Sequence, residues 1–330
     1  MLTPSEDERF VLSQEVPTPI GAPHSAAGLE QDTEIAARQL GQLELIWIRF
    51  RRHKFALIGA TVIGLLILMA VFAPIISPES PLGYNYMASN VPPRWTWPWN
   101  HDWRYVMGSD TNGHALLMWI AYGARVSLAV GMFSALLTSV IGIILGGIAG
   151  YYGGWTDTII MRATDVVLTL PFLPLIILLS YYVTGGNWVL IVLIFGLLGW
   201  PGVARLIRSY YLSFTRQEFT EAARAVGVSD ARIIFRHILP NALSPVIVST
   251  TLAVAGFIVA EAAIDFLGVG IRWPSVSWGL ALSNSQNYFG VGNWWWTVFP
   301  GLFILITVLA INFMGDGLRD ALDVRSRAGE

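Results

Sequence analysis

Two residue types that commonly do chemistry, cysteine and lysine, are absent or nearly absent from this sequence of 330 residues. Cysteine is absent, which excludes disulfides, cysteine-ligated zinc, iron–sulfur clusters and a thiol nucleophile. Lys54 is the only lysine and follows a histidine, and no G-x-x-x-x-G-K-[ST] loop for nucleotide phosphates occurs. The sequence therefore predicts that this chain hydrolyses no ATP, has no catalytic residues, and binds no cofactor or metal.

A group of acids and histidines precedes the second long apolar run. His101, Asp102, Asp110 and His114 include metal-ligand types, but their spacing matches no known ligand pattern. An ordinary polar loop is the favoured interpretation.

Two pairs of charged residues stand inside or beside apolar runs. Glu261 and Asp265 are four residues apart, and ionisable groups in a membrane face either a water-filled cavity or a partner. Both alternatives are open, which makes this pair candidates for a translocation path. Arg162 and Asp165 are three residues apart and are predicted to pair with each other as a structural ion pair.

The stretch 218–241, EFTEAARAVGVSDARIIFRHILPN, is the largest charged interruption in an apolar region. Thr215 and Glu218 have capping-box spacing, which predicts a helix from Arg216. Gly227 supplies the left-handed residue that ends a helix. Ser229 can cap a second helix, which is predicted to end before Pro240.

The two helices predicted in this stretch have different faces. On the second, Ile234 and Ile238 share one face, and Arg232 and Arg236 share another. On the first, small residues lie beside charges, a pattern that suits docking into a groove of another protein. These residues are Glu221, Ala222, Ala223 and Arg224. The spacing also fits a helix-turn-helix, but attachment to membrane spans at both ends argues against DNA binding.

The composition and the apolar runs place the chain in a membrane. The chain is 54% hydrophobic and 13% charged, against about 25% charged in soluble proteins. The first charge-free run, residues 55–77, is 23 residues long, which is enough to cross a hydrocarbon core of about 30 Å as a helix. An all-α protein with six spans is predicted, at residues 55–77, 126–150, 158–183, 188–204, 242–266 and 295–314.

The distribution of Lys and Arg predicts the orientation of these spans. Positive residues gather before span 1, between spans 4 and 5, and after span 6, and positive residues stay on the cytoplasmic side. Both termini and the loop 205–241 are therefore expected in the cytoplasm. The same reasoning gives a cytoplasmic segment 1–54, an extracytoplasmic loop 78–122, and a cytoplasmic tail 317–330.

Three glycines of span 2 lie on one helix face. Gly142, Gly146 and Gly150 recur every four residues, the spacing that lets membrane helices approach closely. Helix packing is favoured over a ligand role.

Several stretches together resemble one family. EAARAVG (221–227), followed by HILPN (237–241), resembles the EAA loop of ABC-importer membrane subunits. His237 stands where the wider superfamily has an aliphatic residue. In this respect the motif resembles that of the branch that serves dipeptides, oligopeptides and nickel. Stretches at 122–131, 149–165, 266–279 and 299–323 resemble the same branch. The segment WIRFRRHKFALIGA resembles the N-terminal helix of the branch's second permease. GSDTNGHA (108–115) departs from the branch pattern, which leaves a different docking surface or cargo open.

The resemblance implies an ABC importer type I transmembrane fold with its core at 123–316, in a bacterial or archaeal plasma membrane. It implies that the two short helices are coupling helices, in which Glu221 and Gly227 carry the transmission. The coupling set is Glu218, Glu221, Ala222, Ala223, Arg224, Gly227, Ser229, Arg232, His237, Leu239 and Pro240.

The implied partners are a second permease forming a pseudo-symmetric heterodimer, two ATPases that bind ATP and Mg, an extracytoplasmic substrate-binding protein and membrane lipid, with no nucleic acid. Di- or oligopeptides are the expected cargo, moved inward by alternating access, and oligosaccharide or nickel is the alternative cargo. An ion-coupled secondary transporter and a non-transporting scaffold are the alternatives from other classes. The first would show broken helices with mid-membrane charges and internal repeats, which are not clear in the sequence.

Overall fold

The computed structural model describes residues 42–77, 85–93, 102–288 and 292–322. The chain divides into a unit of residues 1–45 and a unit of residues 46–330, and the long helices lie in the second unit. Every long element in its described part is a helix.

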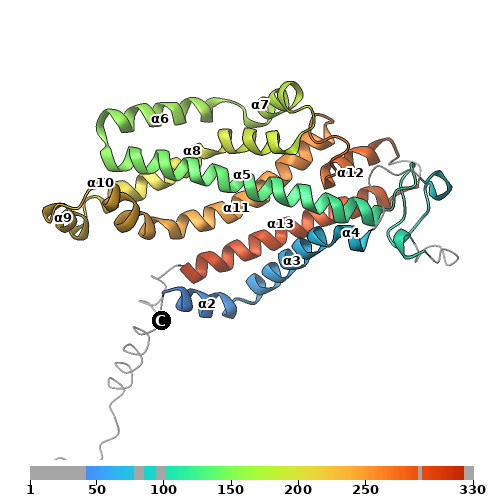
Figure 1. Cartoon of the computed structure of the whole chain (residues 1–330), viewed down its shortest axis with the longest axis horizontal. Helices are drawn as coiled ribbons and strands as arrows, with labels where there is room; N and C mark the ends of the chain where they lie inside the picture. Colours follow the sequence, from blue (N-terminus) through green and yellow to red (C-terminus); the bar gives the residue numbers. More distant parts are fainter. Residues whose placement is uncertain (1–41, 78–84, 94–101, 289–291, 323–330) are drawn as a thin grey trace, which may run out of the picture. The chain divides into compact units, whose positions relative to one another are not determined.

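Long apolar helices form the body of this unit (Figure 1). Within the described ranges, five helices are long and apolar enough to cross a membrane, and one bent pair adds a candidate sixth span. Four of the five are α3 (Lys54–Val71), α5 (Leu116–Tyr152), α8 (Trp188–Phe214) and α13 (Trp295–Leu322). The fifth is the helical segment Asp230–Phe266, which ends in α11 (Leu239–Phe266). The bent pair is α6 (Gly154–Thr169) with the segment Phe172–Val183, which begins with α7 (Phe172–Leu179).

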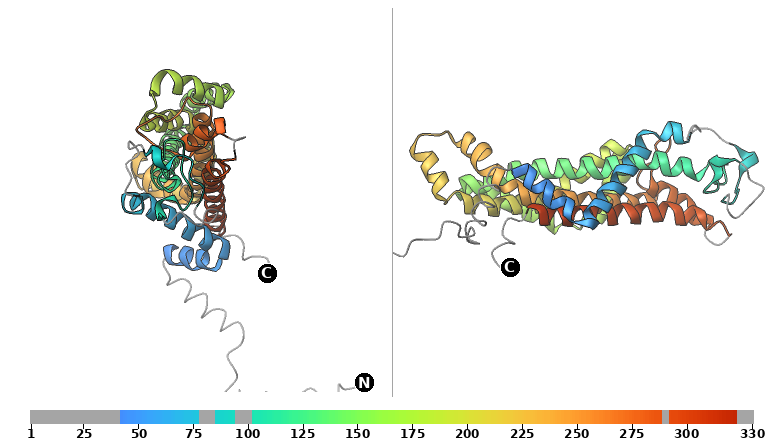
Figure 2. Two further views of the ribbon diagram at one scale, coloured as in Figure 1. Left: turned by 90° about the vertical axis from the view of Figure 1, so that its right-hand side faces the viewer. Right: turned by 90° about the horizontal axis from the view of Figure 1, so that it is seen from below.

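Shorter helices connect these elements or flank them. They are α2 (Gln42–Arg52), α4 (Ala73–Ile76), η1 (Tyr86–Ala88), η3 (Trp103–Tyr105), η4 (Ser180–Thr184), α9 (Glu218–Ala225), α10 (Asp230–Arg232), η5 (Ile233–Ile238), α12 (Trp278–Ser285) and η6 (Gln286–Tyr288). In two views of the ribbon, α9 and α10 lie at one end of the bundle and α12 toward the other (Figures 1 and 2). We refer to these as the α9 end and the α12 end.

The third predicted span is not a single helix. The prediction of a continuous helix at 158–183 was wrong, because α6 and the helix that follows it meet at an angle of 83°. Pro171 causes the break: Leu170 before it is extended, with φ −74° and ψ 133°, as the residue before a proline prefers.

The other helices continue beyond the predicted apolar runs. Helix α5 begins at Leu116 rather than 126, within the predicted loop 78–122, and α8 ends at Phe214 rather than 204. Helix α13 extends to Leu322, inside the predicted tail 317–330. The apolar runs were bounded by charges, and a charge need not end a helix. Arg125, for example, stays within α5 while its guanidinium caps α3, donating to the carbonyl oxygens of Ala70 at 2.5 Å and Val71 at 2.9 Å.

The glycines of α5 lie where this helix meets α8. A Cβ at Gly142 would come within 2.5 Å of the Cβ of Val203, and one at Gly150 within 2.6 Å of the Cβ of Tyr211. The two backbones therefore approach more closely than side chains would allow. This contact sets the positions of the helix ends that carry the candidate site.

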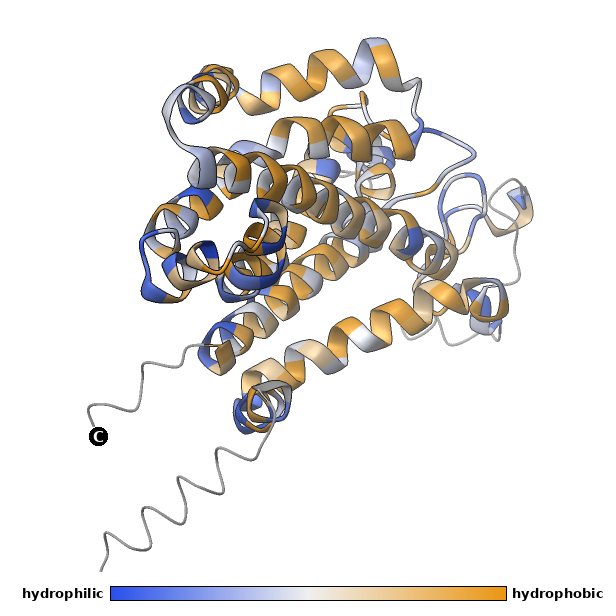
Figure 3. Cartoon of the chain, turned by 60° about the vertical axis from the view of Figure 1, so that its left-hand side comes forward, coloured by the Kyte–Doolittle hydropathy of each residue, from blue (hydrophilic) through white to orange (hydrophobic). Residues whose placement is uncertain are grey.

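The surface polarity agrees with a membrane bundle. Hydrophobic residues cover the long helices, whereas hydrophilic residues gather around α9 and in the loops (Figure 3). Among the exposed side chains of α8, Val189, Leu193 and Leu197 in its first half are apolar, whereas Arg205 and Ser209 in its second half are polar. The α9 end is thus the more polar end of this helix.

Candidate functional site

Helix α9 begins later than predicted. Its N-cap is Gln217, and the hydroxyl of Thr215 donates to the carbonyl oxygen of Leu212 at 3.2 Å instead of capping α9. The capping box was a wrong prediction because α8 extends far enough to make Thr215 its own C-cap. The side chain of Thr220 connects α9 to the end of α8 instead, because its hydroxyl donates to the carbonyl oxygen of Phe214 at 2.8 Å.

Gly227 ends α9, as predicted. Its φ is +77°, a conformation that costs other L-residues about 1–2 kcal/mol. Its N–H donates to Arg224 at 3.0 Å, and the N–H of Val228 donates to Ala223 at 3.1 Å. These are the two bonds of a Schellman motif. The turn between the two predicted helices is therefore specified by one glycine.

The second predicted helix does not end before Pro240. Helix α10, the π-helix η5 and α11 follow without a gap, so that one continuous helical segment covers Asp230–Phe266. Pro240 lies in the first turn of α11, where a missing N–H is tolerated, and the π-helical turn precedes it. Ser229 occupies the N-cap position, but its side chain makes no capping hydrogen bond in the described structure. We call Glu218–Ile238 the α9–η5 segment.

One face of the α9–η5 segment is buried against the ends of the long helices. Ile234 and Ile238 pack with residues of α5, α8 and α11, as their predicted common face requires, and Ile233 packs with them. Ala223 was predicted, with Ala222, to belong to the small-residue patch that suits docking, but it is buried in the same cluster of this chain. His237 and Leu239 are half-buried at its edge.

The opposite face of the segment is exposed. The remaining predicted coupling residues lie there or beside it, namely Glu218, Glu221, Ala222, Arg224, Gly227, Ser229, Arg232 and Pro240. Two apolar side chains that the sequence analysis missed accompany them: Val226 is 79% exposed and Phe235 is 60% exposed. For Phe235 a signal was available in the sequence, since it lies off the helix face that carries Ile234 and Ile238.

Ion pairs join α6 to α8 near the α9 end. Arg208 forms a bidentate ion pair with Asp157, with 2.6 Å between Arg208 Nη2 and Asp157 Oδ2. The predicted pair of Arg162 and Asp165 is present at 3.6 Å, but Asp165 lies closer to Arg205, at 2.6 Å. Arg205 was missed because it lies on another helix.

Glu261 and Asp265 are both buried, which favours a partner over a water-filled cavity. Asp265 Oδ1 accepts the N–H of Ile271 at 2.6 Å, and Oδ2 accepts the hydroxyl of Ser277. Glu261 Oε2 accepts the hydroxyl of Ser127 at 3.2 Å. The pair thus joins α11 to α5 and to the turn before α12, and it does not line an open path in this structure.

Replacing Asp265 with alanine is expected to destabilise the protein. The Ile271 N–H and the Ser277 hydroxyl would lose their acceptor, and each buried orphaned group costs about 1–3 kcal/mol. Thermal unfolding in detergent should shift to lower temperature. Asp316→Ala removes an exposed acid of α13 as a control, and equal unfolding temperatures for the two variants would contradict the prediction.

The polar residues before α5 form a hydrogen-bonded turn. Asp110 Oδ2 lies 2.9 Å from His114 Nδ1 and accepts the indole N–H of Trp119 at 3.1 Å. Asp102 instead pairs with Arg104, whose guanidinium lowers the pKa of that carboxyl. His101 lies outside the described residues. Over the described ranges, no group of three or more His, Cys, Asp or Glu side chains is placed to hold a metal ion.

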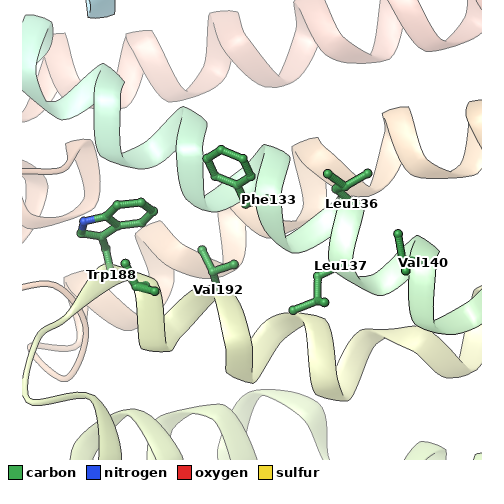
Figure 4. A pocket seen from close by; sticks show the side chains of 7 residues that line it. Phe133, Leu136, Leu137, Val140, Trp188 and Val192 are labelled. Atoms are coloured by element: carbon green, nitrogen blue, oxygen red, sulfur yellow. The ribbon is translucent and has the colours of Figure 1, made fainter.

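An apolar groove lies between α5 and α8, away from the charged residues. Phe133, Leu136, Leu137 and Val140 line it from α5, and Trp188, Val189 and Val192 line it from α8 (Figure 4). Its volume is about 390 Å³. None of its lining side chains carries a charge.

The arrangement of helices in this bundle also occurs in a transporter of known structure. A solved structure shares the fold: the MetNI methionine ABC transporter in an inward-facing conformation aligns with a TM-score of 0.50 and 20% identity. The alignment covers 62% of this chain and 96% of that chain.

Sequence comparisons identify the family. Residues 142–328 match the family of binding-protein-dependent transport system inner membrane components, and residues 41–93 match the N-terminal transmembrane domain of oligopeptide transport permease C. The chain is 36% identical to the dipeptide transport system permease protein DppC of Bacillus subtilis, covering 97% of this chain and 94% of the relative. It is 37% identical to the oligopeptide transport system permease protein OppC of Haemophilus influenzae, covering 84% and 87%. This chain belongs to the dipeptide and oligopeptide permease family of ABC importers, which are multi-pass proteins of the bacterial inner membrane.

Proposed function

We propose that this chain is the pore-forming subunit of a binding-protein-dependent importer that moves di- or oligopeptides inward by alternating access. The α9–η5 segment carries the proposal. Its inner face is packed on three long helices, and its outer face presents charged side chains beside exposed Val226 and Phe235. Exposed apolar and charged groups on a rigidly held segment suit the groove of a partner protein.

The orientation follows from the charges at the two ends of the bundle. Arginines gather at the α9 end and at the start of α3, and positive residues are retained in the cytoplasm. We infer that the α9–η5 segment and both termini are cytoplasmic, and that the α12 end faces outward. The segment is thereby placed where ATP is available.

The proposed partners supply what this chain lacks. Two ATPase subunits, which bind ATP and Mg, dock on the α9–η5 segment and on its counterpart in a second permease. An external binding protein delivers the cargo at the α12 end. The relatives' names support peptides as cargo, with nickel or an oligosaccharide as the alternatives. The ATPases bias the path because their ATP-bound and free states hold the segment differently.

A co-purification experiment tests this proposal. The tagged chain, expressed with the other subunits of its transporter, is expected to bring down a second permease and two ATPases. In proteoliposomes supplied with the binding protein, a labelled dipeptide should enter only with ATP. Uptake by the isolated chain driven by an ion gradient, or purification without ATPases, would overturn the proposal in favour of a secondary transporter.

A further inference from the structure

We propose that Tyr151 is a positioning residue that makes α5 follow the α9–η5 segment when the ATPases move it. This inference rests on the proposed function. Tyr151 is the last residue but one of α5, and its side chain is only 9% exposed. It lies at the point where α5 meets the segment.

The side chain of Tyr151 contacts both helices of the segment. Its hydroxyl donates to Asp230 Oδ1 at 2.6 Å, at the start of α10. The guanidinium of Arg224, in the last turn of α9, lies over its ring at 5.2 Å from the centroid. One side chain of α5 therefore holds the two helices on either side of the Gly227 turn.

A second tyrosine supports this contact from α8. The hydroxyl of Tyr211 donates to the carbonyl oxygen of Ile234 at 3.2 Å, within η5. Gly150, next to Tyr151, makes room for Tyr211, because a Cβ there would lie 2.6 Å from the Tyr211 Cβ. The glycine contact between α5 and α8 thus brings both hydroxyls to the segment.

The consequence is a continuous mechanical connection. Asp230 is the first residue of the continuous helix that runs through α10 and η5 into α11. The hydrogen bond from Tyr151 to Asp230 therefore joins the start of this helix to the end of α5. Helix α5 then runs 37 residues toward the α12 end, where Ser127 bonds Glu261 of α11. A displacement of the α9–η5 segment reaches α5 through the hydroxyl and the ring of Tyr151.

The tyrosine-to-phenylalanine variant isolates the hydroxyl. In the complete transporter, Tyr151→Phe is expected to retain both ATPases and the packing of the ring. The ATP hydrolysed per peptide imported should rise roughly three- to tenfold, the effect of losing one hydrogen bond of ordinary strength, because the acceptor Asp230 is exposed to solvent. A merely structural role would lower the yield of folded transporter and leave this ratio unchanged. Tyr152→Phe is the matched control, because its side chain is 57% exposed and its ratio should not change.

Variants of the acceptor complete the test. Asp230→Asn keeps an oxygen that can accept the Tyr151 hydroxyl and should preserve the ratio. Asp230→Ala should match Tyr151→Phe, and the double variant should be no worse than either single variant, since both remove the same bond.

Two results distinguish the inference from the proposed function. A wild-type ratio in Tyr151→Phe with both ATPases bound, or fully additive effects in the double variant, would overturn the role of Tyr151 alone. Failure of the unmodified chain to co-purify with ATPases would instead overturn the proposed function.

Discussion

Replacing Glu221 with lysine is expected to lower ATP-driven uptake at least about tenfold while the protein remains folded in the membrane. Glu221 lies in the first turn of α9, and its side chain is exposed. An acid at this position gains only about 0.3–1 kcal/mol from the helix dipole, so its loss has little effect on the fold. If the docked ATPase presents a positive group to Glu221, a reversed charge places like charges together, which costs several kcal/mol.

The measurement is peptide uptake in proteoliposomes, together with the quantity of ATPase that co-purifies. Glu221→Gln keeps the shape of the side chain without its charge and should show a smaller loss. Asp316→Lys reverses an exposed acid of α13, outside the segment, and should transport normally. Full uptake by Glu221→Lys, or its disappearance from the membrane, would contradict a role confined to docking.

Much of this fold could be predicted because its determinants are local. Charge-free runs indicated where long helices cross the membrane, since backbone groups in lipid must be satisfied within the helix. Gly227 could be identified as a helix end because glycine adopts a positive φ at less cost than residues with a Cβ, whatever surrounds it. The common face of Ile234 and Ile238 followed from helical periodicity alone.

The errors arose where one local signal competed with another. Thr215 had the type and spacing of an N-cap, but α8 continues far enough that Thr215 is its C-cap instead. Pro171 and Pro240 were both potential helix breaks, and only the first bends the chain sharply. The difference is that Pro240 stands in the first turn of α11, after a π-helical turn, whereas Pro171 follows the extended Leu170. Sequence spacing does not reveal which helix turn a proline will occupy.

The site contacts were harder to predict because their partners are distant in sequence. Asp265 bonds the turn that precedes α12, and Asp165 bonds an arginine of α8, 40 residues away. Tyr151 and Asp230 are separated by 79 residues. None of these three interactions can be inferred from helical periodicity, which relates only residues within one helix. The exposed residues of the α9–η5 segment could thus be predicted in part, but the bonds that connect the segment to the spans could not.

Replacing Gly146 with valine is expected to prevent the normal packing of α5 on α8. A Cβ at this position would lie well under 3.0 Å from the carbonyl oxygen of Ala204, a backbone atom that cannot move aside as a side chain can. The helices would have to separate, at a cost of at least about 3 kcal/mol, the upper part of the range for overpacked cores. Because Tyr151 and Tyr211 reach the α9–η5 segment from these helix ends, the separation would also displace the proposed docking surface.

The folded fraction after detergent extraction, followed by size exclusion and thermal unfolding, measures this effect. Gly202→Val is the matched control on α8, because a Cβ at Gly202 meets no atom within 4 Å. We expect Gly146→Val to lose most of its folded protein, and Gly202→Val to keep it. Equal stability of the two variants would show that α5 and α8 can separate without cost. The contact between these helices could then not be what positions the α9–η5 segment.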